Sequence, residues 1–101
     1  MIPQQGLMLR RLGGISRVAS GTTQVTSDPA PPGTRAALLG PVIGTSPCVA
    51  IGPAPVVDTA TDVILPSGAL RVILACSPGE RVAWAPRSGD ANSQLSVAFM
   101  G

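Results

Sequence analysis

The sequence predicts an all-β protein, a small β-sandwich or jelly-roll-like barrel with an extended N-terminal arm. Residues 48–101 contain short runs in which apolar side chains alternate with others, and turns rich in Pro and Gly separate these runs at near-regular intervals. No stretch has the 3.6-residue apolar period and the end signals of a convincing helix. At 101 residues the chain forms one domain at most.

Residues 1–47 are expected to form the arm and a linker. Pro and Gly residues in the first 14 positions leave room for about one and a half helical turns, which is too short to be stable alone. An extended arm is therefore expected, followed by a weakly alternating run at residues 15–20 that is compatible with a strand. Residues 20–33 are dominated by Ser, Thr, Pro and Gly, which is typical of a linker.

Residues 48–101 are expected to form the sandwich body. The strongest strand pattern is at residues 69–76, and residues 81–85 and 95–99 alternate in the same way. The sequence Ser-Pro-Gly-Glu at residues 77–80 fits a tight turn with Pro second and Gly third. Shorter strands are expected near residues 48–51 and 62–65.

The second faces of the last strands carry small or apolar side chains where a solvated face would carry charges. Either a second sheet or a partner is therefore expected to cover them, and an ordinary sandwich core is the simpler interpretation. The residues concerned are Ile73, Ala75, Ala83, Ala85 and Ala98.

The composition indicates a chain whose apolar surface is partly covered by other subunits. Hydrophobic residues make up 45% of the sequence and charged residues only 12%, which leaves little polar surface to cover a monomer. All seven basic residues are arginine, and they are too scattered for the dense basic patch of a nucleic-acid-binding protein. No signal peptide is recognisable, and no apolar run approaches the ~20 residues that span a bilayer.

The residue types needed for most catalysis are missing. The sequence has no histidine, lysine or tyrosine, so the usual bases and many metal ligands are absent. Asp58 and Asp62 are the closest carboxylates and are interpreted as turn residues. Cys48 and Cys76 match no zinc spacing and are interpreted as small buried hydrophobes, with a disulfide left open. The lone Trp84 is assigned to the core rather than to a sugar or base platform. We therefore expect no enzyme, no metal and no cofactor.

The candidate site is the N-terminal arm, which combines apolar and basic side chains. An extended segment of this kind adds a strand to a partner's open sheet edge, and its arginines then pair with acidic groups. The alternative is a frayed terminus. The residues expected to bind the partner are Ile2, Leu7, Met8, Leu9, Arg10, Arg11, Leu12 and Arg17.

Residues 49–52, 56–62, 65–72 and 76–83 resemble small β-structured virion proteins of tailed bacteriophages. A strand, an acidic or Thr-rich turn, a Leu-Pro-x-Gly turn, a strand and a Pro-Gly hairpin follow in that order within residues 48–99. The resemblance implies a capsid cement or decoration subunit, made in the host cytoplasm and located in the virion. Its partners would be the major capsid protein or other virion subunits, with homo-oligomerisation and without a membrane or a specific nucleic acid. A head–tail or tail accessory protein and a ligand- or glycan-binding β module are the alternatives.

Overall fold

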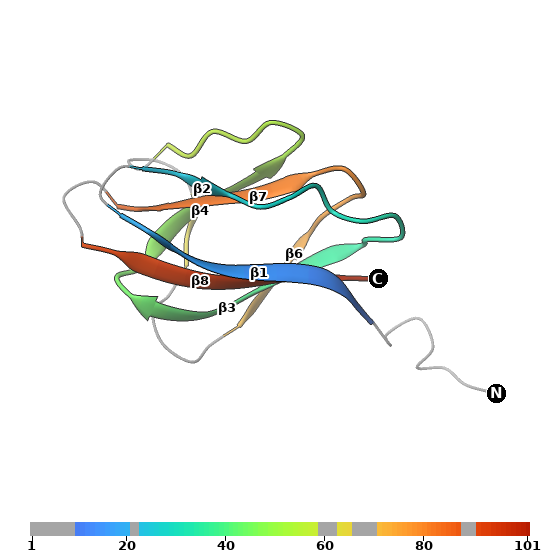
Figure 1. Cartoon of the computed structure of the whole chain (residues 1–101), viewed down its shortest axis with the longest axis horizontal. Helices are drawn as coiled ribbons and strands as arrows, with labels where there is room; N and C mark the ends of the chain where they lie inside the picture. The colour runs from blue at the N-terminus through green and yellow to red at the C-terminus, as the bar shows by residue number, and fades with distance from the viewer. Residues whose placement is uncertain (1–9, 21–22, 59–62, 66–70, 88–90) are drawn as a thin grey trace.

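The computed structural model describes residues 10–20, 23–58, 63–65, 71–87 and 91–101, and within them the chain is all-β without a helix (Figure 1). Two antiparallel four-stranded sheets pack face to face, which confirms the predicted β-sandwich. Sheet A has the strand order β1-β8-β3-β6, and sheet B has the order β2-β7-β4-β5. The strands are β1 (Arg11–Ala19), β2 (Val25–Thr26), β3 (Ala36–Gly44), β4 (Pro47–Gly52), β5 (Val63–Ile64), β6 (Val72–Ala75), β7 (Arg81–Pro86) and β8 (Ser93–Met100).

The core lies between the two sheets and is built from the strand faces that the sequence predicts. Leu95, Val97 and Phe99 on β8 are buried, whereas the residues between them are half-buried. Val82 and Trp84 on β7 are both 0% exposed and belong to the same cluster. Strict two-residue alternation places every second side chain in the core, and this explains why β7 and β8 are recognisable from the sequence.

The turn before β7 is also confirmed. The Glu80 amide donates a hydrogen bond of 3.1 Å to the Ser77 carbonyl, and Gly79 has a φ of +85°, which glycine adopts without a steric penalty. The Glu80 carboxylate accepts a hydrogen bond of 2.6 Å from the Ser77 amide. The Glu80 side chain therefore closes its own turn.

The expected boundary between residues 47 and 48 lies inside the sandwich. Strand β3 is an interior strand of sheet A, between β8 and β6, although it comes from the segment interpreted as a linker. Gly40 and Pro41 interrupt an otherwise apolar run, and a proline argues against a central strand. The ladder between β3 and β8 shifts register between Leu39 and Val42, so Pro41 lies at an irregularity where no regular ladder bond is needed.

Strand β1 likewise belongs to the sandwich and begins within the expected arm. It pairs with β8 from Arg11 to Ala19, and Arg10 exchanges two backbone hydrogen bonds with Gly101, at 2.6 and 2.9 Å. A Cβ atom at Gly14 would collide with the Val97 carbonyl oxygen. The glycine that argued against regular structure therefore permits a close approach of β1 to β8.

On sheet B the chain itself covers β7 on the face that points away from the core, whereas Ile64 of β5 on the same face is 45% exposed. Ala83 and Ala85 on this face of β7 are 0% and 1% exposed. The Gln24 side chain donates to the Pro55 carbonyl at 2.9 Å and accepts from the Val57 amide at 2.7 Å. In sheet B, β7 lies between β2 and β4. Gln24 directly precedes β2, whereas residues 53–58 follow β4. The hydrogen bonds between them therefore require residues 53–58 to cross the outer face of β7, where the two alanines lie (Figure 1).

Candidate interaction surface

The face of sheet A that points away from the core, here called the outer face of sheet A, presents large apolar side chains to solvent. Val18 on β1 is 51% exposed, and Ile43 on β3 and Ile73 on β6 are each 62% exposed. The strand register places Val18 and Ile43 on either side of Gln94, and it places Ile73 beside Leu38. The predicted division of residues 71–75 between two faces is confirmed, but the face with Ile73 is open instead of being covered by a second layer.

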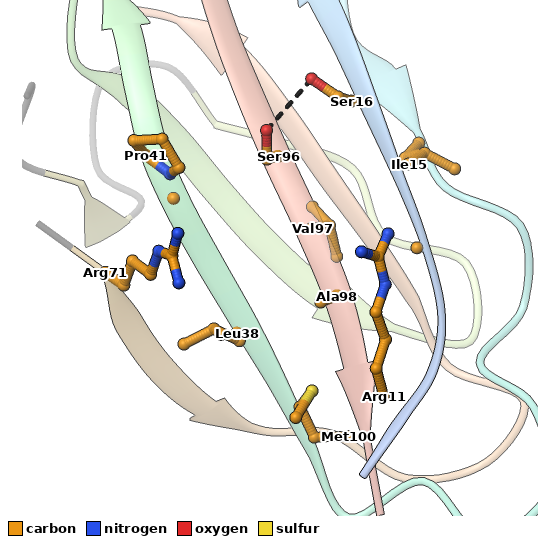
Figure 2. A pocket seen from close by; sticks show the side chains of 12 residues that line it. Arg11, Ile15, Ser16, Leu38, Pro41, Arg71, Ser96, Val97, Ala98 and Met100 are labelled. Carbon is orange, nitrogen blue, oxygen red and sulfur yellow. Dashed lines mark hydrogen bonds between the residues drawn. The ribbon is translucent and has the colours of Figure 1, made fainter. Parts of the chain in front are cut away.

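A hollow of about 540 Å³ lies in this face and crosses the two interior strands of sheet A (Figure 2). Its floor is mainly apolar and includes Leu38, Pro41, Ala98 and Met100. The strands supply these side chains because every second residue of β3 and β8 points away from the core.

Two arginines flank the hollow from opposite edges of the sheet. Arg11 is the first residue of β1, and Arg71 directly precedes β6. Figure 2 shows both side chains reaching inward, so that their guanidinium groups lie on the two sides of the apolar floor. Both residues are exposed, and no carboxylate of the described residues lies within the 4.0 Å ion-pair distance of either guanidinium group.

Hydroxyl groups close one end of the hollow. The Ser96 hydroxyl donates a hydrogen bond of 3.1 Å to the Ser16 hydroxyl. The Ser16 hydroxyl also accepts a hydrogen bond of 3.3 Å from the side-chain amide of Gln94. These side chains partner one another across β1 and β8. They add a side-chain connection to the backbone ladder between the two strands. Since these groups are uncharged, the charge of the site comes from Arg11 and Arg71.

The structure brings only part of the predicted site together. Arg11 lines the hollow, whereas Arg17 is exposed elsewhere along β1. The Leu12 Cδ1 atom lies beside the backbone of Gly33 and Gly101, and Arg10 extends the ladder with β8. The remaining predicted residues, Ile2, Leu7, Met8 and Leu9, lie outside the described residues.

The other residues of the hollow were not predicted as binding residues, although Ala98 was assigned to a face that a second sheet or a partner would cover. Arg71 carries no local signal of a site, because the strand order alone places it across the sheet from Arg11. The alternation at residues 71–75 does assign Arg71 to the non-core face. That pattern could have identified the face, but it could not have identified the opposing arginine.

The two cysteines do not bond to each other. Cys48 lies on β4 and Cys76 follows β6, and they are 1% and 2% exposed, as expected for small buried hydrophobes. Burial, with a further contribution from the Glu80 carboxylate, raises the pKa of the Cys76 thiol above its ordinary value. The thiolate form that reacts with electrophiles or metals is therefore disfavoured at neutral pH.

The described residues contain no group of three or more His, Cys, Asp and Glu side chains arranged to hold a metal ion. Asp62, one member of the carboxylate pair Asp58 and Asp62, lies outside the described residues. Trp84 is fully buried in the core, and its indole N–H has no hydrogen-bond partner there. A buried indole offers no stacking surface to a sugar or a base.

No helix of the described residues has the length and apolar character needed to cross a membrane. Comparisons with protein-family models, with curated proteins and with solved structures found no match. The fold and the surface define a small all-β sandwich in which the chain covers β7 on the outer face of sheet B, and in which the outer face of sheet A exposes Val18, Ile43 and Ile73 and contains a hollow flanked by two arginines.

Proposed function

We propose that this protein is a non-catalytic structural subunit that binds neighbouring protein subunits through the outer face of sheet A. The setting we propose is the virion of a tailed bacteriophage, where the chain acts as a capsid cement or decoration subunit. One observation carries the binding role: Val18, Ile43 and Ile73 are more than half exposed on the same face of one sheet. The virion setting rests on the resemblance of residues 48–99.

A single exposed hydrophobic residue is ordinary, but several on the face that contains the hollow form a patch that usually marks an interaction site. An antiparallel sheet that faces water on one side normally carries polar residues there. The outer face of sheet A departs from that pattern, since only Ser16, Gln94 and Ser96 supply an uncharged polar stripe. Burial against a neighbouring subunit accounts for the remainder of the face.

The N-terminal residues contribute to the proposal from a defined starting point. Residues 1–9 lead to Arg10, whose neighbour Arg11 lines the hollow. Nine residues span at most about 30 Å when extended, which is far enough to reach a neighbouring subunit. Many copies on a repeated lattice would sum weak contacts of this kind through multivalency.

Binding to particles tests the proposal. The purified chain is added to particles produced without its gene, and association is measured by co-sedimentation through a density gradient. We expect the chain to travel with the particles. A chain that stays at the top of the gradient with every particle preparation refutes the proposed function.

A truncation tests the N-terminal contribution separately. Removing residues 1–9 leaves β1 intact, whereas removing residues 1–20 would also delete the strand that pairs with β8 along the edge of sheet A. We expect the shorter truncation to fold, as shown by unchanged thermal unfolding, and to bind particles more weakly. Binding equal to that of the full chain would assign the interaction to the sandwich alone.

A further inference from the structure

The hollow combines two properties that one kind of partner segment matches. Leu38, Pro41, Ala98 and Met100 form a floor without charge, which favours apolar side chains. Arg11 and Arg71 stand on opposite sides of that floor, so that their guanidinium groups flank it (Figure 2). An apolar segment placed on the floor would lie between two positive charges.

Both guanidinium groups need partners if the face is buried. A cation taken from water without a counter-charge carries a large desolvation penalty, and a carboxylate in bidentate contact is the partner that a planar guanidinium fits best. No carboxylate of the described residues lies within ion-pair distance of either group, so the carboxylates must come from outside this part of the chain. The positive charges would also disfavour a partner surface rich in arginine or lysine.

We propose that the hollow receives an acidic segment of the partner protein, in which apolar side chains fill the floor and flanking carboxylates pair with Arg11 and Arg71. This inference rests on the proposed function and specifies the chemistry of its interface. A nucleic acid fits the same site poorly, because two arginines beside an uncharged floor are far from the dense basic patch that phosphate backbones require.

The absence of lysine from the sequence allows a site-specific test. In R11K and R71K the new side chain provides the only lysine amine of the chain, and a carbodiimide couples an amine only to a carboxylate close enough to touch it. R87K is the matched control, because Arg87 is exposed at the end of β7 on sheet B. Each variant is bound to particles and treated with the carbodiimide, and the joined peptides are identified by mass spectrometry. The wild-type chain measures the background from its α-amino group.

We expect the lysines of R11K and R71K to be cross-linked to Asp or Glu side chains of the partner, and these side chains should lie within one apolar segment. The yield of cross-linked peptide should be well above that of R87K and the wild type. In parallel, R11E and R71E should each bind particles about 30-fold more weakly than R87E, since each leaves opposed carboxylates buried together. Trp84 emission verifies folding, because this residue is the sole tryptophan and is fully buried.

The outcomes separate the two proposals. If the wild-type chain binds particles but R11K and R71K give no more product than R87K, or R11E and R71E bind as well as R87E, the acidic-segment inference is overturned and the proposed function stands. If the wild-type chain does not bind particles, the proposed function fails and the inference falls with it.

Discussion

Replacing Ile43 and Ile73 together by threonine should abolish most of the affinity for the partner while leaving the fold nearly unchanged. Threonine keeps the β-branch that strands favour but removes apolar surface. Full burial of an isoleucine side chain contributes about 1.5–3 kcal/mol, and each of the two residues is still 62% exposed, so up to about 1–2 kcal/mol per residue remains available to an interface. For the pair this amounts to about 2–4 kcal/mol, which corresponds to a loss of affinity between about 30-fold and several hundredfold.

The assay is a titration of labelled chain onto particles, with Val56→Thr as the matched control. Val56 is 80% exposed and lies on the segment that covers β7 of sheet B, so the control makes the same kind of apolar-to-hydroxyl change, though a smaller one, on the opposite side of the molecule. Urea unfolding of all three proteins, followed by Trp84 fluorescence, shows whether stability changed. If I43T/I73T binds within threefold of V56T, the outer face of sheet A is not the interface and the reasoning from exposed surface is wrong.

Three further changes test how the sandwich is held together. Ser27→Ala should lower the free energy of unfolding by about 1–3 kcal/mol in urea titrations, because the buried serine hydroxyl accepts the Val82 amide at 2.9 Å and that donor would lose its partner; an unchanged midpoint would show that another acceptor takes over. Gly14→Ala should cost about 1–3 kcal/mol, because its Cβ would collide with the Val97 carbonyl oxygen and force β1 from β8; hydrogen exchange should then speed up along β1, and protection equal to the wild type's would contradict the close approach. For Cys76 the pKa is raised in the folded state, so its contribution to stability is complete below the ordinary thiol pKa and is lost as the pH rises through the raised value. Unfolding titrations between pH 7 and 10 should show that the free energy of unfolding falls less for Cys76→Ala than for the wild type. Parallel curves for the two proteins would contradict a raised thiol pKa.

The sequence was sufficient where one strand has a single core face. In β7 and β8 the alternation of large and small side chains identifies the strand, its inner face and the buried Trp84, because the two-residue period follows directly from strand geometry. The Pro-Gly turn between β6 and β7 is equally local, since its two residues are selected for the dihedral angles of that turn.

The sequence was insufficient where a tertiary contact overrides a local preference. Strand β3 contains Pro41 and was assigned to a linker, but a register shift against β8 accommodates the proline within the sheet. Strand β1 contains two glycines, and Gly14 is required by the short distance to the β8 backbone, which no local pattern reveals. The hollow is the same kind of case, because the pairing order of four strands brings Arg11 and Arg71 to it from positions 60 residues apart.

The difference between the two outer faces also indicates what kind of surface the proposed partner would present. On sheet B the covering segment passes over Ala83 and Ala85, whose short side chains allow the covering backbone to lie close to the sheet. On sheet A the exposed residues are the large, branched Val18, Ile43 and Ile73, which lie on the same face as the hollow. A backbone cannot approach such a face closely, so only projecting side chains that interdigitate with these three and enter the hollow can exclude water from it. We therefore expect a partner surface that carries large apolar side chains between its carboxylates. A flat acidic surface without such side chains would leave the hollow unfilled.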